Sequence, residues 1–168
     1  PGKGALTREL LGSRCKVLAV EKDKELYEFL KTKLAEEIRS GQLNLIQGDI
    51  LNFDTRTYNL KTRTYKIIAN IPYNITGAIL KKFLTAERQP ESMVLMVQHE
   101  VAQRIIGHRE STPYSKSSHG RKLSKESLLS ISVKAYGEPK MIMKVAARYF
   151  SPKPKVDSAI IAIKNISR

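Results

Sequence analysis

The residues best suited to carry out chemistry stand together as Asn70-Ile71-Pro72-Tyr73. The exocyclic amine of adenine is a poor nucleophile, because its lone pair is delocalised into the ring. Two acceptors that grip its hydrogens, such as the side-chain carbonyl of Asn70 and a backbone carbonyl held near Pro72, can turn that lone pair toward an electrophile. The ring of Tyr73 can stack on the base. The simpler interpretation is a turn after a strand with a buried tyrosine.

A second aromatic residue, Phe150, precedes a loop stiffened by prolines that also carries Lys153 and Lys155. Such a loop can supply a second stacking face for a base, together with cations for phosphate groups. The alternative is a rigid connection between two strands, with Phe150 in the core. The sequence thus predicts a pair of aromatic residues, Tyr73 and Phe150, on either side of a base.

Glycines and acids elsewhere in the chain have the spacing of a nucleotide site. A glycine-rich turn lets the backbone approach a cofactor, and an acidic residue about 20 positions further on can bind ribose hydroxyls. Glu21 lies 17 residues after Gly4, and Gly2 precedes it in the same turn. A dinucleotide pattern has a third glycine where Thr7 stands. Asp49 can accept a hydrogen bond from an adenine amine, although a Gly-Asp pair is usually only a turn.

Alternating strands and helices are expected to position these residues. Apolar runs and helical spacing predict strands at 16–20, 43–46, 65–69, 92–97, 128–136 and 157–163, and helices at 5–12, 23–40, 76–86 and 98–106. This order predicts an open, mostly parallel α/β sheet, in which ligands bind at the carboxyl ends of the strands. The glycine turn, Glu21, Asp49 and Asn70 all fall at or just after such ends. Because a turn of this kind usually follows a buried strand, we expect residues upstream of Pro1 to be missing.

The charge of the chain predicts a polyanionic partner. The net charge is +14, of which residues 1–100 contribute +4 and residues 101–168 contribute +10. A polar, serine-rich stretch at 108–122 is predicted to be a long mobile loop. We expect the cations that contact such a partner to lie in that loop and after Phe150, namely Lys116, Arg121, Lys122, Lys153 and Lys155. Charged surfaces of this kind can also be merely solvated.

Composition excludes several other classes of protein. Cys15 is the only cysteine, so an intramolecular disulfide is impossible, and three scattered histidines give no zinc spacing. No apolar run approaches the roughly 20 residues of a membrane-spanning helix. A chain of 168 residues is expected to form one domain, 1–168, in a reducing, cytoplasmic setting.

Taken together, the motifs resemble the ribosomal RNA adenine dimethyltransferase family, and more closely its small-subunit enzymes. The matching segments are Pro1-Gly2-Lys3-Gly4-Ala5-Leu6-Thr7, Val20-Glu21, Gly48-Asp49-Ile50-Leu51, Asn70-Ile71-Pro72-Tyr73-Asn74-Ile75, Gln98-His99-Glu100-Val101 and Phe150-Ser151-Pro152-Lys153-Pro154-Lys155-Val156-Asp157-Ser158. The last segment fits the family pattern Phe-x-Pro-x-Pro-x-Val-x-Ser.

The resemblance implies a class I, Rossmann-like methyltransferase fold with S-adenosylmethionine as methyl donor and no metal. The first strand and a C-terminal helical domain of the family are expected to be missing. The donor would contact Gly2, Gly4, Glu21, Asp49 and Asn70. The target adenine would contact Asn70, Pro72, Tyr73 and Phe150, and two transfers would give N6,N6-dimethyladenosine.

The resemblance further implies a monomer that acts on ribosomal RNA in an immature small subunit. Two alternatives stay open at this point. One is an erythromycin-resistance-type methylase of large-subunit RNA. The other is an RNA-binding assembly or transcription factor that keeps the fold without needing the chemistry.

Overall fold

The computed structural model describes residues 1–56, 64–107 and 126–167 of the chain. It divides the chain into two compact units, unit 1 from Pro1 to Lys61 and unit 2 from Thr62 to Arg168, and each is described by itself. The predicted loop at 108–122, with Lys116, Arg121 and Lys122, lies outside the described residues. No helix in the described ranges is long and apolar enough to cross a membrane.

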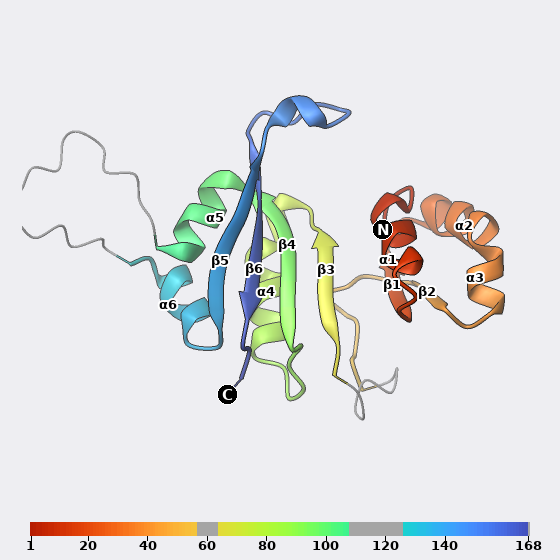
Figure 1. The fold of residues 1–168 in the computed structure, drawn as a ribbon, viewed down its shortest axis with the longest axis horizontal. Coiled ribbons are helices and arrows are strands. Elements are labelled where there is room, and N and C mark those ends of the chain that lie inside the picture. Colours follow the sequence, from red (N-terminus) through yellow and green to blue (C-terminus); the bar gives the residue numbers. More distant parts are fainter. Residues whose placement is uncertain (57–63, 108–125, 168) are drawn as a thin grey trace, which may run out of the picture. The chain divides into compact units, whose positions relative to one another are not determined.

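Unit 1 is a two-stranded parallel sheet with three helices (Figure 1). Its elements are α1 (Ala5–Gly12), β1 (Val17–Glu21), α2 (Lys24–Lys33), α3 (Ala35–Arg39) and β2 (Leu43–Gln47). Val17 pairs with Leu43 at one end of the ladder and Glu21 with Gln47 at the other. Because the strands are parallel, Glu21 at the end of β1 and the Gly48-Asp49 turn after β2 lie at the same edge of the sheet.

A small apolar cluster holds unit 1 together. It comprises Leu11, Ala19, Leu30, Leu34 and Leu43. The prediction of one helix over 23–40 was wrong, because the helix is interrupted at Leu34, where the backbone turns to φ −117° and ψ 32°. The interruption leaves the Leu34 side chain only 2% exposed. Helical spacing of apolar residues is the same for one helix and for two short ones, so the sequence could not reveal it.

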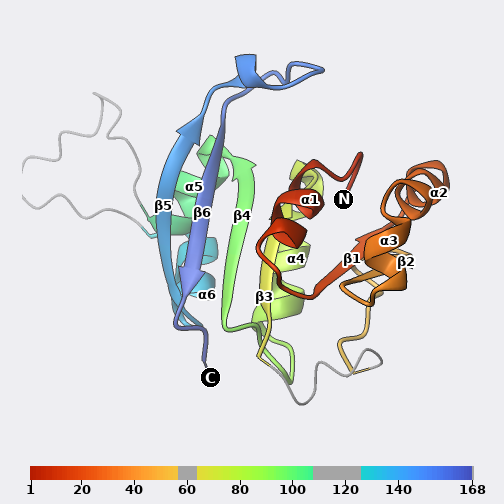
Figure 2. The same ribbon diagram turned by 45° about the vertical axis from the view of Figure 1, so that its right-hand side comes forward.

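Unit 2 is a four-stranded mixed sheet in the order β3-β4-β6-β5. Its elements are β3 (Lys66–Asn70), the 3₁₀ turn η2 (Tyr73–Ile75), α4 (Thr76–Leu84), β4 (Ser92–Gln98), α5 (His99–Ile106), α6 (Leu128–Lys134), β5 (Glu138–Val145), the 3₁₀ turn η3 (Ala147–Tyr149) and β6 (Ser158–Lys164). Strands β3 and β4 are parallel, whereas β6 runs antiparallel to both β4 and β5. Helices α4, α5 and α6 lie on one face of the sheet, as two views show (Figures 1 and 2).

The face of this sheet under the helices forms the core of unit 2. Met93, Leu95 and Val97 alternate along β4, and Ile161 and Ile163 along β6, all with no exposed area. Burying one such side chain contributes about 1.5–3 kcal/mol, so this alternation fixes the register of β4 against β6. The carboxyl end of β4 is therefore held firmly beside the beginning of β6, where Gln98 pairs with Ser158.

The C-terminal part differs from the prediction in two places. Residues 128–136 were expected to be a strand, but α6 forms there. The Ser127 side chain caps this helix, because it accepts a hydrogen bond from the Ser130 amide. Strand β5 was not predicted at all. Its ladder shifts register between Met141 and Met143, so a bulge breaks the alternation that would reveal a strand.

A pair of glycine substitutions tests the packing of the first turn. Gly4 has φ +81°, and a Cβ there would lie 2.6 Å from Cδ2 of the buried Leu30. Gly2 has φ +59°, and a Cβ there would have nothing within 4 Å. Gly2→Ala should cost about 1–2 kcal/mol of unfolding free energy from backbone strain alone. Gly4→Ala should cost a further ~1–3 kcal/mol from overpacking. Urea unfolding followed by circular dichroism measures both, and equal losses would contradict close packing at Gly4.

Candidate functional site

Glu21 organises the end of β1 in unit 1. One carboxylate oxygen, Oε2, accepts a hydrogen bond from the Gly2 amide at 2.9 Å, and the other, Oε1, accepts one from the Asp23 amide at 2.9 Å. The carboxylate thereby links the glycine turn to the beginning of α2, and it keeps an acceptor position for a ligand hydroxyl.

The charge of Glu21 is maintained despite its burial. Burial raises the pKa of this carboxyl, whereas the hydrogen bonds from the Asp23 and Gly2 amides lower it. Glu21 is therefore ionised at neutral pH. An ionised acceptor beside an open glycine turn suits a ribose, since the Gly2 backbone has free space on its Cβ side.

Asp49 acts as a turn residue in unit 1. Its Oδ1 accepts a hydrogen bond from the Leu51 amide at 2.9 Å, and its Oδ2 lies 3.0 Å from the ammonium of Lys22. This is the simpler of the two interpretations of the Gly48-Asp49 pair. The predicted contact of Asp49 with an adenine amine stays a prediction.

A hollow in unit 1 lies between the glycine turn and α2. It measures ≈ 290 Å³ and is lined by Lys3, Asp23, Glu25, Leu26 and Phe29. None of Gly2, Gly4, Glu21 or Asp49 lines it. The hydrogen bonds of Glu21 are the better guide to a nucleotide site here, because they join the glycine turn to the end of β1.

The predicted target-base residues of unit 2 line one pocket. The pocket measures ≈ 320 Å³ and is lined by Asn70, Ile71, Pro72, Tyr73, Phe150, Pro152 and Pro154. Asn70 is the last residue of β3, and Tyr73 begins η2, so the end of a strand and a tight turn present the first group of residues. The β5–β6 connection brings Phe150 to the same pocket from far along the chain.

Two polar groups of the residues that line this pocket can act as acceptors. Asn70 is exposed at the end of its strand, opposite Met96 of β4. The Pro72 carbonyl accepts one hydrogen bond, from the Ile75 amide at 3.2 Å, and keeps its second lone pair. Two acceptors beside two aromatic rings can hold an aromatic amine by both its hydrogens and its ring.

Tyr73 is held by a residue for which the sequence indicated no role. Its hydroxyl lies 2.7 Å from the hydroxyl of Ser158, which is fully buried at the beginning of β6. A ring whose far end is tied to a buried strand keeps its face in one orientation. Ser158 ends the Phe-x-Pro-x-Pro-x-Val-x-Ser segment, and this position was the only signal of it in the sequence.

Asp157 fastens the segment that carries Phe150. Its Oδ1 accepts a hydrogen bond from the Ala147 amide at 2.9 Å, and its Oδ2 lies 2.9 Å from the ammonium of Lys144. Its backbone carbonyl accepts a hydrogen bond from the His99 amide. The Ala147 hydrogen bond and Lys144 lower the pKa of the Asp157 carboxyl, and slight desolvation opposes them. The carboxylate is thus ionised at neutral pH and joins β5, η3 and β6.

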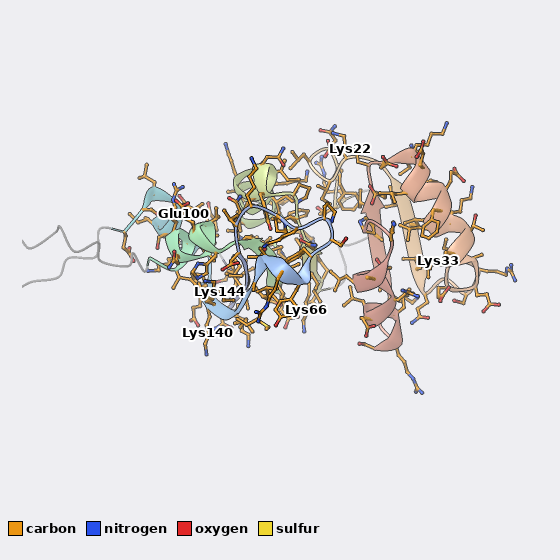
Figure 3. The ribbon with its side chains drawn as sticks, turned by 90° about the horizontal axis from the view of Figure 1, so that it is seen from above. Lys22, Lys33, Lys66, Glu100, Lys140 and Lys144 are labelled. Carbon is orange, nitrogen blue, oxygen red and sulfur yellow. The ribbon has the colours of Figure 1, made fainter. Side chains whose placement is uncertain are left out.

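Basic side chains are frequent along β5, β6 and the connection between them. Between Glu138 and Asp157 the chain has five basic and two acidic residues. Lys153 and Lys155 are exposed in the loop after Phe150. Lys140 and Lys144 project from β5 (Figure 3). Across residues 1–56, 64–107 and 126–167, no group of three or more histidine, cysteine, aspartate or glutamate side chains could hold a metal ion.

Comparison with known proteins identifies the family of this chain. The model of the family "Ribosomal RNA adenine dimethylase" matches residues 1–168. The chain belongs to that family. A small-subunit ribosomal RNA methyltransferase A from Dehalococcoides mccartyi is 41% identical over 97% of this chain and 50% of its own length. The dimethylase chain therefore spans about half the length of this curated relative.

Two solved structures have the same fold. A dimethyladenosine transferase from Plasmodium falciparum superposes with a TM-score of 0.72 at 26% identity, covering 97% of this chain and 52% of the other. The 23S rRNA methyltransferase ErmE superposes with a TM-score of 0.75 at 30% identity, covering 98% of this chain and 58% of the other. These likenesses confirm the predicted α/β methyltransferase fold.

The bond between Tyr73 and Ser158 can be tested by a double-mutant cycle. Ser158→Ala and Tyr73→Phe should each lower the free energy of unfolding by about 1 kcal/mol, because each removes one partner of a part-buried hydrogen bond. The double variant should lose little more than either single variant, since the bond can be lost only once. Urea unfolding of the three variants gives the coupling energy. Strictly additive losses would show that the two hydroxyls do not interact.

Proposed function

We propose that this chain is a catalytic domain that transfers methyl groups from S-adenosylmethionine to the N6 amine of adenosines in small-subunit ribosomal RNA. Two transfers give N6,N6-dimethyladenosine, a modification made during ribosome maturation. The observation that carries the proposal is the pocket that combines the Asn70–Tyr73 segment with Phe150. Membership of the dimethylase family supports it.

In this proposal the pocket residues prepare the amine. The Asn70 side-chain carbonyl and the Pro72 backbone carbonyl each accept one hydrogen of the N6 amine, which turns its lone pair out of the ring. Tyr73 and Phe150 stack on the faces of the adenine and keep water from them. When bound, S-adenosylmethionine supplies an electrophilic methyl group on a sulfonium. The amine held by the Asn70 and Pro72 carbonyls would accept that methyl group and would lose one N–H proton to solvent.

The proposed donor site uses Gly2, Gly4, Glu21 and Asp49 of unit 1, together with Asn70. The residues fit such a donor, because Glu21 is an ionised acceptor with one position free and the Gly2 backbone is open to a close approach. The proposal further requires that units 1 and 2 act as one domain, 1–168. No metal takes part in this proposed chemistry.

The proposed partner is ribosomal RNA within an immature small subunit, bound by a cytoplasmic monomer. The excess positive charge of residues 101–168 favours a polyanion. Lys153 and Lys155 are exposed in the loop after Phe150, where phosphates would pass. Lys116, Arg121 and Lys122 are also proposed to contact phosphates.

A second candidate substrate is large-subunit ribosomal RNA. The similarity to the 23S rRNA methyltransferase ErmE favours it specifically. Methyl transfer measured side by side on immature small subunits, large subunits and naked RNA separates the two. An RNA-binding factor without activity would transfer no methyl group to any of them, and the intact Asn70–Tyr73 segment argues against this third possibility.

Replacing Glu21 tests the donor site. Glu21→Gln removes the charge but keeps the shape, so affinity for S-adenosylmethionine should fall about 10- to 150-fold, the scale of one hydrogen bond to a charged acceptor. Glu28→Gln, an exposed change on α2, is the matched control and should leave affinity unchanged. Calorimetric titration of the full-length protein measures both. Equal affinity in the Glu21 variant would remove this carboxylate from the donor site.

Replacing Asn70 tests the target site. Asn70→Ala should lower single-turnover methyl transfer on the order of 100-fold or more, as the loss of a positioned polar group in an active site does. Donor affinity should change little, because the amide is assigned mainly to the target amine. Asn74→Ala, an exposed amide four positions later that does not line the pocket, is the control. Retention of most of the rate in the Asn70 variant would refute the assignment.

A further inference from the structure

The residue before Phe150 has no role in the proposed chemistry and yet is unusually placed. Tyr149 is 71% exposed, whereas the adjacent Phe150 lines the target pocket. The two side chains leave the backbone in different directions, because Tyr149 ends the 3₁₀ turn η3 and Phe150 has an extended conformation, with φ −109° and ψ 147°. A large aromatic surface therefore faces solvent immediately beside the pocket segment.

The backbone beneath Tyr149 is rigid. The Tyr149 amide donates to the Ala146 carbonyl and the Phe150 amide to the Ala147 carbonyl, and Asp157 holds the Ala147 amide. Ala147 itself is buried. An exposed ring on a fixed backbone loses little conformational entropy when it binds a ligand, since only two side-chain torsions remain free.

Arg148 completes a stacking surface with this ring. Its guanidinium carbon lies 5.1 Å from the centroid of the Tyr149 ring, and one of its nitrogens lies 3.3 Å from the Tyr149 hydroxyl. An aromatic ring and a guanidinium plane are the two groups on which unpaired RNA bases stack most often. Exposed Lys153 and Lys155 on the same connection complement the phosphates of such a strand.

We propose that Tyr149 and Arg148 form a stacking platform for the unpaired nucleotide next to the target adenosine. The proposal rests on the proposed function in one respect, namely that the target base occupies the pocket lined by Phe150. With the target base on one side of the Tyr149-Phe150 pair, its neighbour reaches the exposed side and stacks on Tyr149. The site thereby binds single-stranded RNA through two successive bases.

A ring of this kind could instead be an ordinary exposed aromatic residue, and the chain contains a suitable comparison. Phe29 on α2 is 45% exposed and has the Lys33 ammonium 4.9 Å from its ring centroid. It has the same pairing of ring and cation but lies in unit 1, on a different compact unit from the target pocket. Phe29→Ala is therefore the matched control for Tyr149→Ala.

The test uses short RNAs and the full-length protein. The probe is a seven-nucleotide RNA of uridines with one central adenosine, compared with versions that have an abasic nucleotide directly 5′ or directly 3′ of the adenosine. Affinity is measured by fluorescence anisotropy at low salt. One of the two abasic positions should weaken binding to the unaltered protein about 5- to 100-fold, the scale of stacking one base on one aromatic ring.

Tyr149→Ala should bind the intact RNA as weakly as the unaltered protein binds the abasic RNA, and the abasic position should then make no further difference. Tyr149→Phe and Phe29→Ala should keep the full difference. The proposal is overturned if neither abasic position matters to the unaltered protein, or if Tyr149→Ala remains as sensitive to the missing base.

Methyl transfer to ribosomal RNA is assayed in parallel. Both proposals are supported if Tyr149→Ala loses the discrimination between intact and abasic RNA and the unaltered protein transfers methyl groups. Only the proposed function is refuted if the discrimination depends on Tyr149 but the unaltered protein transfers no methyl group.

Discussion

The antiparallel direction of β6 is the constraint on which the target pocket depends. In unit 2 the parallel strands β3 and β4 end at one edge of the sheet, and an antiparallel neighbour must begin at that same edge. Ser158 consequently pairs with Gln98 at the end of β4 and meets the Tyr73 hydroxyl beyond the end of β3. A parallel strand at this place would begin at the opposite edge and would carry Phe150 away from Tyr73. Two chemically unlike segments, remote in sequence, thus form one pocket because of the direction of a single strand.

Both candidate sites use an ionised carboxylate to hold backbone rather than to perform chemistry directly. Glu21 accepts the Gly2 and Asp23 amides in unit 1, and Asp157 accepts the Ala147 amide in unit 2. In each case these hydrogen bonds favour the charged form and lower the pKa of the carboxyl. A carboxylate that satisfies backbone donors makes an irregular turn rigid without regular secondary structure. This suits a site whose contacts with the ligand come largely from turns and strand ends.

The sequence predicted most strands and indicated residues for a pocket, but it did not indicate how those residues are supported. Short apolar runs, such as residues 43–46, indicated strands, and the structure has β2 there. The break at Leu34 was invisible because apolar spacing continues across it, and β5 was missed because its bulge at Met141–Met143 disrupts the alternation. The motif around Asn70 was recognisable because its chemistry requires particular residue types in sequence. Ser158 was not, because its partner is Tyr73, 85 residues away, and the contact exists only once β6 is in place.

The chemistry of the pocket explains why it alone cannot select an RNA. In the proposed function, carbonyl acceptors and aromatic faces would recognise the amine and ring of adenine, and these are identical in every adenosine of every ribosomal RNA. Phosphate contacts by Lys153 and Lys155 would add affinity without sequence information. The similarity of this chain both to a small-subunit methyltransferase and to a 23S rRNA methyltransferase is consistent with this division. Selection must therefore depend on surfaces outside the pocket that sense which nucleotides are unpaired and how the strand approaches. In unit 2 the exposed ring of Tyr149, adjacent in sequence to a pocket residue, lies where such a selection would begin.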